Sequence, residues 1–104
     1  MDHSRYLAYR SAMHSLERTP EWVLDEHERE RLRDTAEGLL LTSDADDAER
    51  LRSDAAVALS LLVGQRRGDD AWADALWREI SDSGPRDPLG ATRRARALTF
   101  AGAM

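Results

Sequence analysis

Apolar residues recur at steps of three and four along most of this chain, which is the spacing of one face of a helix. No stretch alternates apolar and polar residues in the way that a half-buried strand does. The most apolar stretch, Ala55 to Val63, holds one polar residue in nine. We interpret it as the inner part of a central helix around which the other segments pack, and the whole pattern predicts an all-α fold.

The first predicted helix runs from about Ser4 to Leu16 and begins with aromatic residues. Its expected core face follows the helical spacing, with Ala12 at the edge, and consists of Tyr6, Tyr9, Met13 and Leu16. Pro20 breaks the helix, because proline disfavours helical geometry in the residue before it. In the turn that follows, we expect Trp22 and Leu24 to plug the core.

Acidic residues with capping spacing mark the starts of three more helices. Asp25 opens the second, since Glu28 completes a capping box, and its expected buried residues are Leu32, Ala36, Leu39 and Leu40. The cluster from Ser43 to Asp47 opens the third, about Asp46 to Val63, whose expected core face is Ala48, Leu51, Ala55, Ala58, Leu59 and Leu62. The turn from Gly68 to Asp70 opens the fourth, whose face is Trp72, Ala73, Leu76, Trp77 and Ile80.

Glycine, proline and arginine indicate where the last two of these helices end. The third ends near Gly64, with Arg66 and Arg67 placed to meet the negative end of the helix dipole. The fourth ends at Gly84 and Pro85. Because Trp77 lies at the edge of the fourth apolar face, we expect it to be more exposed than Trp72.

The connections are short, and short connections favour antiparallel neighbours. The sequence therefore predicts a small up-and-down four-helix bundle over residues 1–84. Residues 85–104 form a basic C-terminal tail or a short fifth helix that docks on the bundle, since Asp87 and Pro88 offer a cap and a first-turn proline. One hundred and four residues are enough for one such domain.

Composition indicates the type of organism and the cellular compartment of the protein. All fifteen basic residues are arginine, which we attribute to the coding bias of a high-GC bacterium, because surface positions such as Arg29 and Arg31 are arginine as well. The absence of cysteine removes disulfides and thiolate metal sites and fits a reducing cytoplasm. No apolar run is long enough to span a membrane, and we see no leader segment, so we expect a cytoplasmic protein.

The residues that carry chemistry are few. His3 and His14 lie about three helical turns apart, too far to share a metal ion. His27 and Glu30 have adjacent-turn spacing, but they project away from the expected core face into water. The glycine-flanked segment Gly64–Gly68 lacks the lysine and the preceding strand of a phosphate loop, and no serine has a nucleophile-elbow pattern. We expect no catalytic, cofactor-binding or metal-binding residue.

Two features, an apolar pair on the third helix and a basic tail, indicate surfaces that contact another segment or another molecule. Val57 and Leu61 point about 160° away from Leu59 at 100° per residue, so they need cover from the first helix, from the tail through Leu98 and Phe100, or from another protein chain. The tail has four arginines and one acid from residue 85 onward. It can dock on its own acidic body, bind an acidic protein or touch nucleic-acid phosphates. The candidate partner-binding residues are Val57, Leu61, Arg93, Arg94, Arg96 and Phe100.

The leading hypothesis is a noncatalytic protein–protein interaction module, an accessory or regulatory subunit whose partner is another protein or a second copy of itself. The alternative is a nucleic-acid-associated regulator whose basic tail contacts phosphates. The net charge of −5 argues against nonspecific nucleic-acid binding by the whole domain. A third hypothesis, an enzyme that uses the charged cluster around His27, has the least support.

Overall fold

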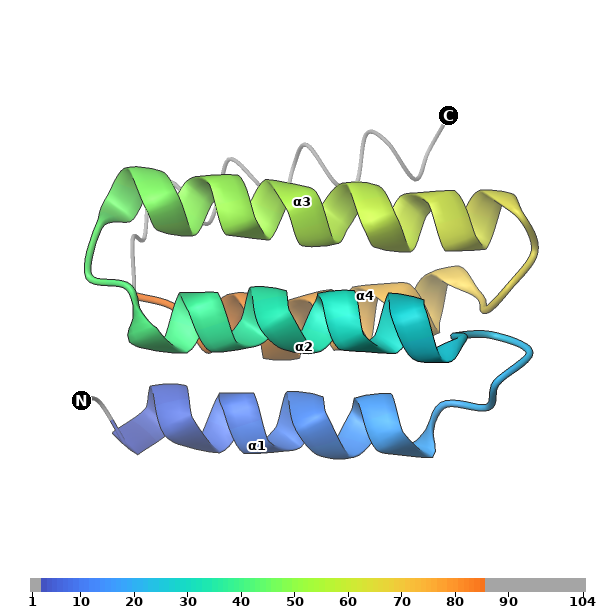
Figure 1. The fold of residues 1–104 in the computed structure, drawn as a ribbon, viewed down its shortest axis with the longest axis horizontal. Coiled ribbons are helices and arrows are strands. Elements are labelled where there is room, and N and C mark those ends of the chain that lie inside the picture. Colours follow the sequence, from blue (N-terminus) through green and yellow to red (C-terminus); the bar gives the residue numbers. More distant parts are fainter. Residues whose placement is uncertain (1–2, 86–104) are drawn as a thin grey trace.

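The computed structural model describes residues 3–85 and shows four helices and no strand in that range. They are α1 (His3–Arg18), α2 (Glu26–Leu41), α3 (Ala45–Gly64) and α4 (Asp70–Asp82), which run alternately in opposite directions (Figure 1). The predicted starts and ends agree with these bounds to within about two residues. The predicted fifth helix, and with it Arg93, Arg94, Arg96, Leu98 and Phe100, lies outside the described residues.

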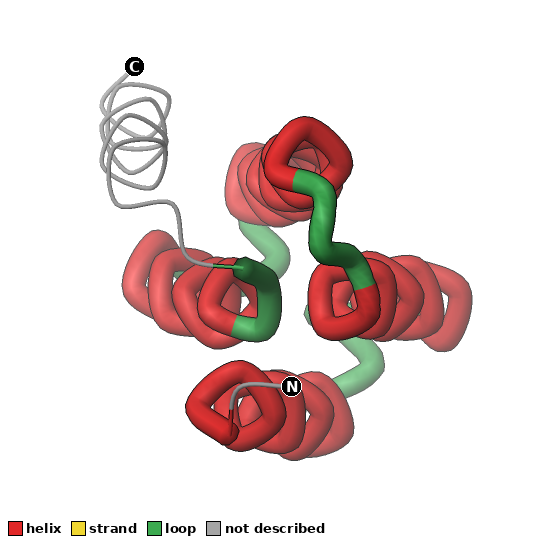
Figure 2. Tube along the Cα trace, turned by 90° about the vertical axis from the view of Figure 1, so that its left-hand side faces the viewer, coloured by secondary structure: helices red, strands yellow, loops and turns green. Residues whose placement is uncertain are grey.

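Seen end on, the helices stand at the corners of a square (Figure 2). Each helix contacts its neighbours in the chain, and α4 closes the square against α1, while α2 and α4 also touch across the centre. α1 and α3 lie on opposite corners. This is the predicted up-and-down bundle.

The core lies where the four apolar faces meet. The expected faces of α2, α3 and α4 are confirmed, with only Leu51, Ala58, Trp72 and Ala73 half-buried. Leu24, in the turn after Pro20, plugs the core as predicted. The larger side chains that are fully buried include Leu16, Leu24, Leu39, Leu59, Leu76 and Ile80.

The aromatic face predicted for α1 is partly wrong. Tyr6 is 43% exposed, and Tyr9 and Met13 are only half-buried, whereas Ala12 is fully buried beside Leu16. Polar contacts explain the rotation. Ser11 and Ser15 donate to the carboxylate of Glu79 on α4, and Arg5 points between the ends of α2 and α4.

Arg5 closes the C-termini of two helices at once. Its Nη2 atom donates to the carbonyl oxygens of Leu39, Leu40 and Thr42 at the end of α2, at 2.8, 3.0 and 2.9 Å. Its Nε atom donates to the Ser83 carbonyl after α4, at 3.2 Å. The last carbonyls of a helix lack hydrogen-bond donors within the helix and carry the negative end of its dipole. A guanidinium at this position supplies the donors and a compensating positive charge.

Two further arginines make the same kind of contact between helices. Arg52 of α3 is 3% exposed and donates to the carbonyls of Ser81 and Pro85 at the end of α4. Arg29 of α2 donates to the carbonyls of Leu16 at the end of α1 and Leu24 in the following turn. The expectation that Arg29 is an ordinary surface position is therefore wrong, because its head group is held between two segments.

The end of α3 differs from the prediction as well. The side chain of Arg67 does not meet the last carbonyls of α3 but pairs with Glu28 of α2, with 2.9 Å between Nη1 and Oε2. The carbonyls of Leu61 and Leu62 accept from the backbone N–H of Gln65 instead. The turn between α3 and α4 is thereby tied to the start of α2.

The helix starts follow the predicted capping. Asp25 forms a complete capping box with Glu28, Asp44 accepts from the N–H of Asp46, and Asp69 accepts from the N–H of Trp72. No helix in residues 3–85 has the length and apolar character needed to cross a membrane.

The cap at Asp25 makes stability depend on pH. The backbone N–H of Glu28, which donates to the Asp25 carboxylate, lowers the pKa of that carboxyl below its ordinary value. The contribution of the charged form is thus present at neutral pH and is lost as the pH falls through the lowered pKa. We expect Asp25→Asn, which keeps a capping side chain, to be less stable than the native chain near neutral pH, with the gap closing in acid. Urea unfolding at both pH values measures this, and a gap independent of pH would contradict it.

Candidate functional site

The apolar pair on α3 lies where the rotation count placed it. Val57 and Leu61 are 58% and 61% exposed, and no described residue buries them. α1 lies diagonally across the bundle from α3 and does not cover them, so that alternative is wrong (Figure 2). The remaining candidates for this contact, the tail with its arginines and Phe100 or another chain, are not represented in residues 3–85.

The tryptophans are placed differently from the predictions. Trp22 is 70% exposed and does not plug the core; Val23 and Leu24 are buried in its stead. The N–H groups of Val23 and Leu24 both donate to the Pro20 carbonyl at 3.0 Å, and this tight turn directs Trp22 outward. Trp77, expected to be the more exposed of the two tryptophans of α4, is buried, and its indole N–H donates to the Arg52 carbonyl at 3.2 Å.

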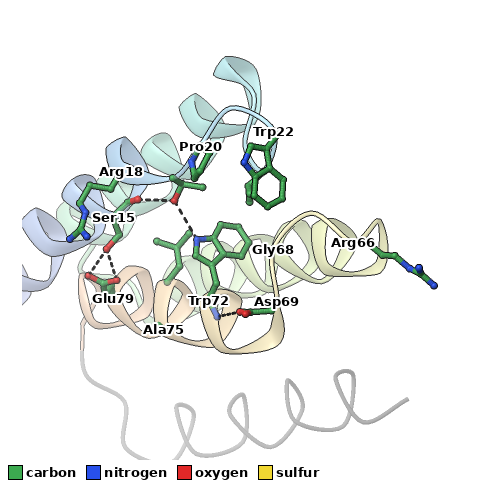
Figure 3. A pocket seen from close by; sticks show the side chains of 13 residues that line it. Ser15, Arg18, Pro20, Trp22, Arg66, Gly68, Asp69, Trp72, Ala75 and Glu79 are labelled. Carbon is green, nitrogen blue, oxygen red and sulfur yellow. Dashed lines mark hydrogen bonds between the residues drawn. The ribbon is translucent and has the colours of Figure 1, made fainter.

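An open cleft of about 570 Å³ lies between the turn after α1 and the start of α4 (Figure 3). Trp22 stands on one side of this indole cleft and the half-buried Trp72 on the other. The remaining lining residues are Ser15, Arg18, Thr19, Pro20, Val23, Arg66, Gly68, Asp69, Ala75, Leu76 and Glu79.

Trp72 is fixed by three contacts with its surroundings. Its backbone N–H donates to the Asp69 cap at 2.8 Å, and its indole N–H donates to the Thr19 hydroxyl at 3.3 Å. The turn before α4 lies against the ring at Gly68, whose φ is 95°. A Cβ there would stand 2.5 Å from Cε3 of Trp72, so only glycine allows this approach. This wall of the cleft is therefore built in advance of any ligand.

The acidic side chains of the cleft are hydrogen-bonded within the bundle, whereas its two arginine side chains are not. Glu79 accepts from the hydroxyls of Ser11 and Ser15, and Asp69 caps α4. Within residues 3–85, the side chains of Arg18 and Arg66 have no hydrogen-bond or ion-pair partner. Figure 3 shows them at opposite ends of the cleft, with Arg66 extending away from it. The groups left for a ligand are two indoles, the apolar lining and the guanidinium of Arg18 at the rim.

The side chains with catalytic or metal-binding chemistry lie outside the indole cleft or are already hydrogen-bonded within the bundle. No histidine lines the cleft, and the carboxylate of Glu79, one of its two acidic lining residues, accepts hydrogen bonds from the hydroxyls of Ser11 and Ser15. His3, His14 and His27 are all exposed, and residues 3–85 contain no group of three side chains able to hold a metal ion. Glu28, beside His27, is committed to the cap at Asp25 and to Arg67.

Comparison with known proteins assigns no family to this chain. No family model, curated protein or solved structure matches it. The indole cleft and the exposed face of α3 are therefore what a functional proposal can rest on.

Proposed function

We propose that this protein is a noncatalytic protein-interaction module, an accessory or regulatory subunit that holds an apolar side chain of a partner protein in the indole cleft. The observation that carries the proposal is the exposure of Trp22 at the mouth of the cleft. Trp22 is not needed to fill the core, because Val23 and Leu24 are buried there. Tryptophan is enriched among the few residues that dominate binding energy at protein interfaces. We place the module in the cytoplasm of a high-GC bacterium, as its composition suggests.

The lining residues of the cleft indicate which chemical groups a partner must present. Val23, Ala75 and Leu76 provide apolar surface between the two indoles, and the volume falls within the range that encloses a ligand group. The guanidinium of Arg18, at the rim, can donate to a carbonyl or carboxylate oxygen of the ligand. The ligand that fits is a peptide segment with one aliphatic or aromatic anchor and a hydrogen-bond acceptor beside it.

The charge of the described body favours a protein over a nucleic acid as the partner. Residues 3–85 carry eighteen acidic residues and eleven arginines, and this excess of negative charge repels phosphates. The nucleic-acid alternative rests only on Arg93, Arg94 and Arg96. It predicts binding that weakens steeply with salt, and the absence of binding at low salt would exclude it.

Replacing Trp22 with alanine tests the proposed function. We expect the affinity for the partner to fall at least about tenfold, because one wall of the cleft is lost. Leu41→Ala is the matched control, since Leu41 is 68% exposed at the opposite end of the bundle, and it should change the affinity less than about twofold.

The partner is identified with a photo-crosslinking amino acid at position 21, the exposed neighbour of Trp22, and again at position 41 for comparison, in cells that contain the native partner. The captured protein is then purified and its affinity for each variant measured by calorimetry. Capture from position 41 and not from position 21 would contradict the proposal, as would equal affinities of the Trp22→Ala variant and the native chain.

A further inference from the structure

We propose that the outer face of α3, formed by Val57 and Leu61, is the docking site of the C-terminal segment of the same chain, residues 86–104. The end of the described chain lies close to α3. The carbonyl of Pro85 accepts from Nη2 of Arg52 at 2.6 Å, so the last described residue is held against α3. The segment that follows α4 therefore starts within reach of a side chain of α3, the helix whose outer face is uncovered.

The distances allow the segment to reach this face. Along α3, Val57 and Leu61 lie five and nine residues beyond Arg52, which is about 7.5 and 13.5 Å at the helical rise. Phe100 lies fifteen residues after Pro85. Fifteen residues span about 22 Å at the helical rise and more when extended. Phe100, and Leu98 two residues before it, can therefore reach the face without releasing Pro85 from Arg52.

The charges of the two parts are opposite. Residues 86–104 carry four arginines and one acid, against eighteen acids and eleven arginines in residues 3–85. Glu49 and Asp54 are exposed on α3 itself. The segment also contains large apolar side chains, among them Leu98 and Phe100, that can cover Val57 and Leu61. Attraction between the two parts thus acts in the same direction as burial of Val57 and Leu61.

The size of the uncovered face favours this occupant over a second copy of the chain. A stable interface between separate proteins buries on the order of 1,200 Å² or more, and two exposed aliphatic side chains are a small part of that. A segment joined to the bundle by a peptide bond has a high effective concentration at the site and needs much less surface. The α3 face therefore belongs to the chain itself, while the indole cleft is left for the partner.

Paramagnetic broadening in the full-length protein tests the proposal. The chain has no cysteine, so a spin label attached through Ala101→Cys is unique. We expect the methyl signals of Val57 and Leu61 to be broadened and those of Leu7 to be retained, since Leu7 is half exposed on α1 at the diagonal corner. Equal broadening of all three, or none, would overturn the proposal. Broadening of isotope-labelled chain by separately spin-labelled chain would assign the contact to a second copy and overturn it as well.

Charge and apolar variants separate the two parts of the contact. Val57→Asp with Leu61→Asp should abolish the broadening at the neighbouring Ala58 methyl group, whereas Ser53→Asp with Ser60→Asp, which add the same charge to exposed positions of α3, should keep it. Arg93→Ser, Arg94→Ser and Arg96→Ser together should also weaken it, without any change to the bundle. Trp22→Ala should leave it unchanged, so failure of this proposal is distinct from failure of the proposed function.

Discussion

Replacement of Arg52 by alanine is expected to lower the free energy of unfolding by about 3 kcal/mol, because hydrogen bonds to charged groups contribute about 1.5–3 kcal/mol each. The guanidinium is almost fully buried and donates to Ser81 from Nε and Nη2, at 3.2 and 2.9 Å, and to Pro85 from Nη2. The variant removes the guanidinium donors from both carbonyls and leaves Ser81 with the weaker backbone donor of Gly84, at 3.2 Å. The loss is smaller than the sum of the bonds, because the native protein already bears the cost of burying a charge.

Arg50 is the matched control for this prediction. It lies two residues earlier on α3, is exposed and pairs only with Asp47, so Arg50→Ala should cost less than about 0.5 kcal/mol. Arg52→Lys should fall between the two, since an ammonium group lacks the planar fork that reaches both carbonyls. Urea denaturation measures all three variants. Equal losses for Arg50→Ala and Arg52→Ala would show that the buried contact carries no special weight.

Gly68→Ala is expected to lower the free energy of unfolding by about 2–3 kcal/mol, through backbone strain and overpacking. The φ of 95° is one that side-chain-bearing residues rarely adopt, and the added methyl group would stand 2.5 Å from the ring of Trp72. Because the ring must move, the near-ultraviolet circular dichroism of the folded variant should change too.

Gly64→Ala provides the comparison. Gly64 is the last residue of α3, and nothing lies within 4 Å of a Cβ placed there. Since alanine is the better helix former, stability should be unchanged or slightly raised. Thermal unfolding of both variants measures the contrast, and a loss at Gly64 as large as that at Gly68 would refute the role of Trp72 and of the backbone conformation.

Local interactions made most of the fold predictable from the sequence. The capping box of Asp25 and Glu28 joins residues three positions apart, and the apolar face of α2 repeats within one helix. α1 was harder, because its rotation depends on Arg5, whose acceptors lie 34 to 78 residues away. A pattern of apolar residues carries no information about such polar contacts.

The candidate sites were predictable to different degrees for the same reason. Rotation along a single helix was enough to place Val57 and Leu61 outside the core. The indole cleft brings together Trp22 and Trp72, fifty residues apart, and depends on a turn that faces Trp22 outward and on a glycine that fits against Trp72. None of these arrangements leaves a periodic signal, and buried Arg52 looks like any other arginine in the sequence.

The contacts of Arg5 and Arg52 also determine how the bundle comes apart. The final turn of an isolated helix opens readily, but the end of α4 is bonded to a side chain from α1 and to another from α3. This turn cannot open without breaking both sets of bonds. Because Arg5 also donates to the end of α2, a displaced Arg5 leaves those carbonyls without their donor as well. The four helices therefore form one cooperative unit, in which loss of the last helix removes the support of the first three.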